Sequence, residues 1–273
     1  MTSGAENRSV SPTPALVDSH VHLYAGFQWS RFFRAAWQNF ERARRELSLE
    51  AADYVLCFTE DARHDTFGDL VEAGAHEDLE ISTTADPAAV EIRHREERLL
   101  VISGRQIITG EGLELLALGT RATIPDGISL LDGVDQVRRA EAIPVVPWAF
   151  GKWWGRRGRV LHAALVGGAP VELGDNSGRL SVSGDPEMFR LARSLGKLVL
   201  PGTDPLPLPH HETRAGTYGF VLEQGLSETR PARDLVGALN SRERRVLRRF
   251  GRRVGIVPFV RDQVALRVRK VGS

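Results

Sequence analysis

Apolar, strand-like segments alternate with helix-like segments along residues 15–204 of this 273-residue chain. Residues 15–24 begin as an apolar run and then alternate, which is typical of a strand that starts buried. The aromatic residues between Trp29 and Phe40 recur at spacings of three and four, which predicts a helix with one apolar face. Such alternation favours parallel βαβ units, in a wound sheet or in a barrel.

The alternation of strand-like and helix-like segments is interrupted in the middle of the chain. Residues 52–59 predict a second buried strand, but residues 89–119 contain several strand-like segments without a helix between them. We interpret this stretch as a β-hairpin elaboration of the α/β fold. No internal repeat or low-complexity linker divides the chain, so we expect one domain over residues 15–273, preceded by a polar, disordered leader at residues 1–14.

The C-terminal end is strongly basic. Residues 241–273 carry 11 Arg or Lys and 2 Asp or Glu, a net charge of +9, whereas the remaining residues carry −8. We expect one or two helices over residues 231–250 and one or two strands over residues 254–268. Helical spacing would put four arginines of segment 242–253 near one face, namely Arg242, Arg245, Arg249 and Arg252. Such a face could bind nucleic acid or an acidic partner, and a solvated helix surface is the alternative.

Composition limits the protein's expected membrane association, cysteine chemistry and cellular location. No apolar stretch approaches the roughly 18–20 residues that cross a bilayer, so no membrane partner is expected. Cys57 is the single cysteine, which excludes an intrachain disulfide and a thiolate metal cluster. The N-terminus has no apolar signal core, and a cytoplasmic location is the default expectation.

The strongest chemical signal is a pair of histidines in the run Asp18-Ser-His20-Val-His22. Side chains two residues apart on a strand point to the same face, so both imidazoles would project together from a strand end. Two neutral imidazoles form half of a zinc, manganese or iron site. Asp204 follows a later strand and could complete the site across the fold, or it could cap a loop. Merely polar or structural histidines are the alternative for the pair.

Two loops could bind substrate. Lys152 and Arg156 follow the predicted strand at residues 143–147 and could bind an anionic group, with Trp153 as a pocket wall. A loop packed on its own tryptophans is the alternative. The second loop carries Asp175, Asn176 and Arg179, which could bind hydroxyl or phosphate groups, although these residue types are also ordinary in turns.

Five segments resemble, in order, the motifs of one family over roughly residues 15–220: DSHVHLY, RLLVISGRQIITGEGLELLALG, AIPVVPW, APVELGDN and LVLPGTDPLPLPHHETRAGTYGF. The chain thereby resembles the PHP (polymerase and histidinol phosphatase) superfamily. The resemblance implies a distorted (β/α)7 barrel, similar to a TIM barrel, with the hairpin as its elaboration. It also implies a phosphoesterase that uses divalent metal ions.

The resemblance transfers only part of the family's metal-ligand set. His20, His22 and Asp204 match family ligands. Glu60 stands where the family has an aspartate and could still bind a metal, whereas Asp61 and Glu114 stand where the family has histidines. Three other ligand positions are occupied by Gln106, Trp148 and Leu206, and His210 or His211 could substitute for the last of these.

Two functional hypotheses follow. The first is a PHP-like hydrolase of a small phosphorylated metabolite or nucleotide, with one or two divalent ions (zinc, manganese or iron) at His20, His22 and Asp204. Its predicted catalytic carboxylates are Glu60, Glu114 and Asp175, and its predicted substrate-binding residues are Lys152, Arg156, Trp153, Asn176, Arg179 and His210. The second is a catalytically inactive relative without metal that binds a ligand or docks a partner, with tryptophans filling the former site.

Overall fold

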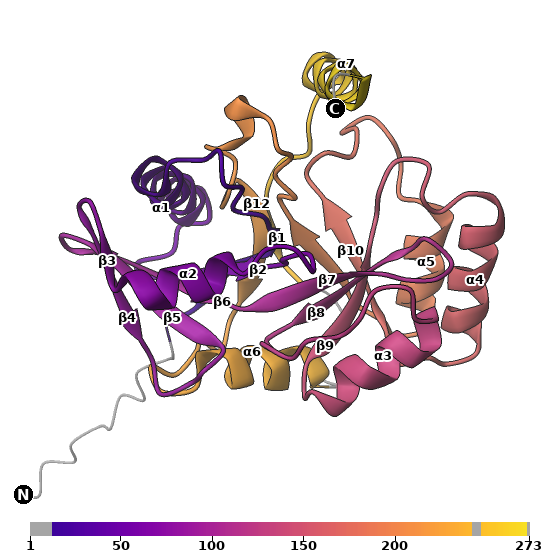
Figure 1. The fold of residues 1–273 in the computed structure, drawn as a ribbon, viewed down its shortest axis with the longest axis horizontal. Helices are drawn as coiled ribbons and strands as arrows, with labels where there is room; N and C mark the ends of the chain where they lie inside the picture. The colour runs from indigo at the N-terminus through magenta and orange to yellow at the C-terminus, as the bar shows by residue number, and fades with distance from the viewer. Residues whose placement is uncertain (1–12, 242–246, 272–273) are drawn as a thin grey trace, which may run out of the picture.

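The computed structural model describes residues 13–241 and 247–271, and its strands form two mixed sheets (Figure 1). The first sheet has the order β13-β12-β1-β2-β6-β5-β4-β3 and the second has the order β11-β10-β9-β8-β7. The strands are β1 Ala15–Val21, β2 Asp53–Phe58, β3 Ala75–His76, β4 Leu79–Thr83, β5 Ala89–His94, β6 Glu97–Ile102, β7 Gly104–Ile108, β8 Glu114–Leu118, β9 Ile143–Pro147, β10 Glu172–Asn176, β11 Val199–Gly202, β12 Tyr218–Leu222 and β13 Arg249–Gly251. The helices are α1 Trp29–Glu46, α2 Thr66–Ala73, α3 Leu130–Arg139, α4 Gly155–Val166, α5 Glu187–Ser194, the short 3₁₀ helix η1 Pro209–His211, α6 Pro231–Asn240 and α7 Ile256–Val271.

The prediction of a distorted (β/α)7 barrel is wrong. Among the described strands, neither sheet closes on itself. The parallel pairs are β1–β2, β2–β6, β9–β10 and β10–β11, but β12, β5 and β8 pair antiparallel with their neighbours and interrupt the parallel winding. The segment that we interpreted as a local hairpin belongs to both sheets, because the chain leaves the first sheet after β6 and enters the second at β7.

Helix α1 forms as the aromatic spacing predicts. Its buried face includes Phe32, Phe33, Trp37 and Phe40, which pack on one side of the first sheet. Two arginines in the last turn interact favourably with the negative end of the helix dipole and stabilise the helix. Figure 1 shows α1 on one side of the molecule and α3, α4 and α5 on the other, where they cover the second sheet.

Strand β1 is buried on both faces, which explains its apolar start. Leu16 belongs to the core cluster under α1, whereas Val17 belongs to a second cluster that also contains Leu235 and Leu239 of α6. A strand covered on both faces reads as an apolar run and does not alternate. Its carboxyl end is therefore rigidly placed, and the candidate site lies there.

Buried Asp18 ties β1 to the segment that follows β11. Its carboxylate accepts hydrogen bonds from the backbone N–H of Thr203, at 2.8 Å, and of Gly216, at 2.9 Å. Burial raises the pKa of Asp18 to about 7, although these hydrogen bonds act in the opposite direction. The backbone N–H of Asp204 also donates to the carbonyl of His20 at 2.8 Å. These bonds hold two distant segments of the chain together next to the predicted site.

The C-terminal predictions need correction. Residues 256–271 form helix α7 and not strands. Their β-branched residues favour a strand locally. Phe259 and Leu266 recur at helical spacing and face a common pocket, so their tertiary packing outweighs the local strand propensity. Arg249 lies on β13, so the predicted helical face of arginines is not found in the described part of segment 242–253. Arg242 and Arg245 lie outside the described residues.

Residues 1–12 of the predicted leader lie outside the described part of the chain. Within residues 13–241 and 247–271, every helix is too short or too polar to cross a bilayer.

Candidate metal centre

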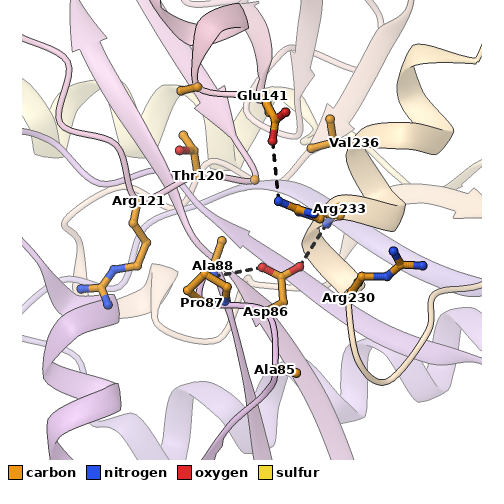
Figure 2. A pocket seen from close by; sticks show the side chains of 12 residues that line it. Ala85, Asp86, Pro87, Ala88, Thr120, Arg121, Glu141, Arg230, Arg233 and Val236 are labelled. Carbon is orange, nitrogen blue, oxygen red and sulfur yellow. Dashed lines mark hydrogen bonds and ion pairs between the residues drawn. The ribbon is translucent and has the colours of Figure 1, made fainter.

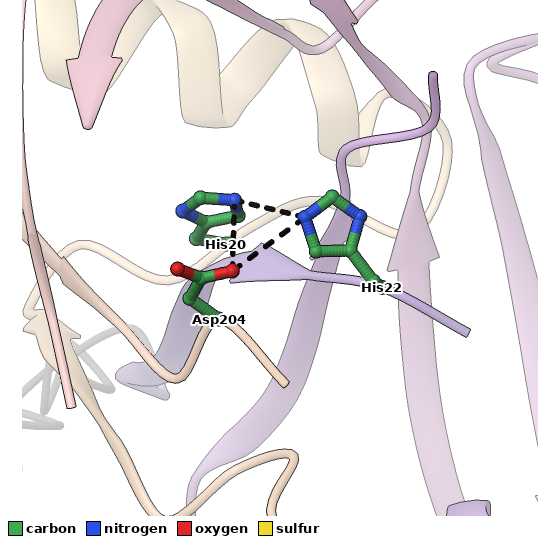
Figure 3. A group of neighbouring side chains, drawn as sticks. All are labelled: His20, His22 and Asp204. Atoms are coloured by element: carbon green, nitrogen blue, oxygen red, sulfur yellow. Dashed lines mark hydrogen bonds and ion pairs between the residues drawn. The ribbon is translucent and has the colours of Figure 1, made fainter. Parts of the chain in front are cut away.

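The ends of β1 and β11 bring His20, His22 and Asp204 together (Figure 3). His20 lies on β1, and His22 follows the strand by one residue, so the two imidazoles share a face. Asp204 follows β11 by two residues and adopts a left-handed backbone conformation with φ of +49°. Asp and Asn tolerate this conformation better than other residues with a side chain. The turn thus directs the carboxylate back toward the histidines.

The three side chains form a compact triangle of ligand atoms. The Nε2 atoms of His20 and His22 are 3.1 Å apart. Each of them lies 3.6 Å from Oδ1 of Asp204. A tetrahedral zinc ion with bonds of about 2.1 Å separates its ligand atoms by about 3.4 Å. The spacing and the mixed nitrogen and oxygen donors therefore fit one divalent ion bound by all three residues.

Burial sets the charge state of the two imidazoles. Burial lowers the pKa of His20 to about 4, and it lowers the pKa of His22 to about 4 with a further contribution from the neighbouring His20. Both rings are therefore neutral at neutral pH, which leaves lone pairs available for a cation. Burial raises the pKa of Asp204, while the nearby His22 and the hydrogen bond from Asn176 oppose the rise.

Asn176, at the end of β10, holds Asp204 in place. Its Nδ2 donates to Oδ2 of Asp204 at 2.9 Å and to the carbonyl of Trp148 at 2.6 Å. Because both amide hydrogens are used, Oδ2 of Asp204 is fixed and Oδ1 is left to face the histidines. Asn176 was predicted to bind substrate, and its contacts in the structure are those of a residue that positions Asp204.

The cluster opens into a cavity of about 390 Å³. Predicted residues that line this cavity are His22, Glu114, Lys152, Asn176 and Asp204. Nζ of Lys152 lies 2.8 Å from Oε1 of Glu114. The charge of Glu114 and a hydrogen bond that His20 donates to Gln106 both favour the protonated form of His20, although burial outweighs them. Glu114 is therefore close enough to the cluster to act on it electrostatically.

Glu60 lies elsewhere, contrary to the expectation that it would join the histidines. Its Oε1 accepts the backbone N–H of Phe67 at 2.9 Å, so it binds the first turn of α2. It lines a separate cavity of about 200 Å³ together with Arg105 and Arg121. Just after β2, the backbone of Thr59 still donates to Val21 of β1, whereas Glu60 forms a parallel bridge with Arg105 of β7.

Glu60→Gln should make folding stability less dependent on pH. Burial raises the pKa of Glu60 from 4.5 to about 7. Because the folded-state pKa is raised, the stability contribution of the protonated group is complete below the unfolded pKa and is lost as pH rises through the folded pKa. Relative to the variant, the wild-type protein should lose about 3 kcal/mol of unfolding free energy between pH of about 4.5 and about 8.

Urea unfolding of both proteins at several pH values measures this difference. Glutamine keeps an acceptor for the Phe67 N–H, so the variant should fold normally. Two stability curves that run parallel across the whole pH range would contradict the buried, protonated state of Glu60.

Asp175 and Arg179 form a buried ion pair and do not line the cavity of the cluster. Nε and Nη2 of Arg179 donate to the two carboxylate oxygens at 2.7 Å and 2.9 Å, and the hydroxyl of Tyr218 donates to Oδ2 at 2.9 Å. Arg179 also donates to the carbonyl of Gly184 at 3.0 Å. These predicted catalytic and substrate-binding residues are therefore placed to hold the loop after β10 in shape.

The tryptophan-rich loop also differs from the prediction. Trp153 is buried in the core and contacts Phe189 edge to face, with ring centroids 5.4 Å apart. Arg156 is exposed on α4 and does not line the cavity. Trp148 and Phe150 line it instead. The number of aromatic residues in this segment does not show which rings are buried in the core and which line the cavity.

Helix α7 and the loop before β12 also contribute residues to the cavity. His211, a candidate substitute ligand in the sequence, lines it together with Arg214, Phe259 and Asp262, which sequence reasoning missed. Predicted His210 lies beside them and reaches Asp262, with 2.8 Å between Nε2 and Oδ1. The sequence signal for this contact is Asp262, the single acid among residues 254–268, a segment whose apolar residues predict strands.

A larger cavity of about 430 Å³ lies at the start of α6 (Figure 2). Its buried carboxylate, Asp86, accepts the backbone N–H groups of Ala88, Ala232 and Arg233. Asp86 is thereby used to cap α6, and Figure 2 shows the side chains of Arg121 and Arg230 pointing in different directions. We assign no chemistry to this cavity.

Comparison with known proteins identifies similar folds. No family model matches the chain, and no curated protein sequence matches it. PsfC from Pseudomonas syringae PB-5123 is similar in structure, with a TM-score of 0.55 and 15% identity over 88% of this chain and 92% of PsfC. At this identity the likeness shows a shared fold and does not extend to activity.

Endonuclease Q is also similar, more distantly. The lesion-specific endonuclease from Pyrococcus furiosus gives a TM-score of 0.47 at 11% identity over 77% of this chain and 52% of that one. Endonuclease Q in complex with a 27-mer duplex substrate gives 0.48 at 12% identity over 84% and 58%. This chain thus spans little more than half the length of those proteins.

Proposed function

We propose that the chain is a metal-dependent hydrolase of a phosphorylated compound and a divergent member of the PHP superfamily. The observation that carries the proposal is the triangle of His20, His22 and Asp204, whose ligand atoms have the separations of a tetrahedral site and open into a cavity. The family membership is supported by the motifs of the sequence. A single ion suits the cluster better than two, because Glu60 lies in another cavity.

The cavity also offers cationic groups for an anionic substrate. Lys152 is paired with Glu114, and Arg214 is paired with Asp262. Charge-assisted hydrogen bonds from such groups bind phosphate oxygens well. The aromatic rings of Trp148 and Phe150 form part of the wall and would reduce the access of water to bound substrate.

Each residue of the cavity has a distinct role in the proposed reaction. A divalent ion bound at the cluster supplies Lewis-acid activation of water and of the scissile group. Asn176 keeps Oδ2 of Asp204 engaged so that the carboxylate holds one orientation. Lys152 binds and orients the anionic group, and Glu114 sets the position of the Lys152 ammonium. Glu114 remains our proposed candidate for accepting a proton at its carboxylate.

A panel of phosphomonoesters and phosphodiesters tests the proposal. Protein treated with chelator should be inactive, and added zinc or manganese should restore phosphate release from at least one substrate. If no divalent ion binds the purified protein or changes its thermal stability, the proposal of a hydrolase is overturned.

Lys152→Met should weaken substrate binding. Loss of one charge-assisted hydrogen bond costs about 1.5 kcal/mol or more, so KM should rise at least about tenfold with a smaller change in kcat. Arg156→Met is the matched control, because the sequence predicts the same role for Arg156 but the structure places it outside the cavity. Equal effects of the two substitutions on KM would contradict the placement of Lys152 in the binding site.

A further inference from the structure

One carboxylate of α7 is contacted by two histidines and one arginine from the segment before β12. Oδ1 of Asp262 lies 2.8 Å from Nε2 of His210, and Oδ2 lies 3.0 Å from Nε2 of His211 and 3.2 Å from Nη2 of Arg214. Arg261, the neighbour of Asp262, also reaches Oδ1, at 3.2 Å. His211 is fully buried and Asp262 is 4% exposed, so the contact is an enclosed one.

The hydrogen bonds of His211 show that this cluster is built for an anion. The backbone N–H of Leu206 donates to Nδ1 of His211 at 2.9 Å. Nδ1 must therefore carry the lone pair, and Nε2 of the neutral ring carries the proton. A protonated Nε2 donates to an oxygen and cannot bind a metal ion. The arrangement of two histidines and one aspartate, which has the composition of a cation site, thus has the polarity of an anion site.

We propose that His210, His211 and Arg214 form a binding subsite for a phosphate or carboxylate group, which Asp262 of α7 fills as an internal ligand. His211 and Arg214 line the same cavity as His22, Lys152 and Asp204. An anion that displaced Asp262 would therefore lie in the proposed active-site cavity. This inference extends the proposed function by adding a second anion subsite and a competitor carried by the chain itself.

Helix α7 is attached in a way that permits displacement. Figure 1 shows it outside both sheets, on the side toward which β10 points. Its outward residues Ile256, Val257, Val260 and Val264 are 52–79% exposed. Its contacts with the body include the pocket-facing residues Phe259, Asp262, Gln263 and Leu266. Among the side chains of α7 that the structure describes, those of residues 256–267, Asp262 is the one with hydrogen bonds or ion pairs to the rest of the fold.

Phosphate binding by the full-length Asp262→Ala protein tests the inference. The titration uses inorganic phosphate, calorimetry and an excess of chelator, so that no metal ion contributes. Removing an intramolecular competitor should tighten phosphate binding by about tenfold or more relative to the wild-type protein. Gln263→Ala is the matched control, since Gln263 lies on the same helix and lines the same cavity. Asp262→Ala combined with Arg214→Met should lose the gain.

Three further measurements distinguish between the possible explanations of a change in phosphate affinity. Acetate in place of phosphate distinguishes a carboxylate site from a phosphate site. If Asp262→Ala disturbs folding, Asp262→Asn keeps the shape of the side chain and should show the same direction of change. In the wild-type protein, saturating phosphate should speed hydrogen exchange in residues 256–267 relative to equal ionic strength of chloride.

The inference is overturned if phosphate and acetate bind Asp262→Ala and Asp262→Asn no more tightly than the wild-type protein, or if the control Gln263→Ala gains as much affinity as they do. Because the assay excludes metal, its outcome is independent of hydrolysis. A protein that binds phosphate in this way but never hydrolyses an ester would refute the proposed hydrolase and retain the anion subsite.

Discussion

Asp204→Asn is expected to lower the affinity for a divalent ion by about a hundredfold or more while the fold persists. The substitution removes the negative charge from the triangle with His20 and His22. Asparagine tolerates the left-handed backbone of residue 204, where φ is +49°, so the turn should survive. Calorimetric titration with zinc and manganese gives the affinity, and thermal unfolding shows whether the variant is folded.

Glu60→Gln is the matched control for Asp204→Asn. The two substitutions make the same chemical change, and the sequence associates both carboxylates with the metal site. The structure places Glu60 at the first turn of α2, in another cavity, so its substitution should leave metal affinity unchanged within about twofold. A large loss of affinity in Glu60→Gln, or none in Asp204→Asn, would contradict the three-residue centre.

Gly202→Ala is expected to destabilise the fold by about 3 kcal/mol, and to weaken metal binding as well. A Cβ at residue 202 would lie 2.6 Å from the backbone nitrogen of His20 and 2.7 Å from its Cβ. These distances are too short for contact, and backbone atoms of a buried strand cannot move aside cheaply. Strand β11 would have to separate from β1, which would move Asp204 away from the histidines.

Gly237→Ala provides a control of opposite sign. Gly237 lies within α6, is exposed, and would place its Cβ in open space. Alanine there should stabilise the protein by up to about 1 kcal/mol, because glycine is unfavourable inside a helix. Denaturant titration measures both variants. If Gly202→Ala unfolds at the wild-type midpoint, β11 does not approach β1 as closely as the structure indicates.

The predictable parts of the fold were those governed by local patterning. The helix from Trp29 and the strands near residues 15 and 53 follow from hydrophobic spacing and were placed within a few residues. The order and direction of the strands in the two sheets were not predictable in this way, because parallel and antiparallel neighbours produce similar apolar runs. The choice of β8 and β12 as antiparallel partners depends on contacts between segments far apart in the chain.

The candidate site was predictable to the same extent. The H-x-H motif places two imidazoles on one face by strand geometry alone, and a carboxylate just after a later strand is a reasonable third ligand. The roles of Glu60 and Asp175 could not be predicted from their positions at the ends of strands. A carboxylate can bind a metal, cap a helix or pair with an arginine, and its neighbours in space decide among these.

The sequence by itself determined that His20 and His22 point in one direction, because a strand repeats every two residues. Only the tertiary structure decided that Asp204 meets them, through the close approach of Gly202 to β1 and the hydrogen bonds of buried Asp18. It likewise decided that Asp262 faces His211 and Arg214. Periodicity is a local property of the backbone, whereas the approach of distant segments depends on packing summed over the whole chain.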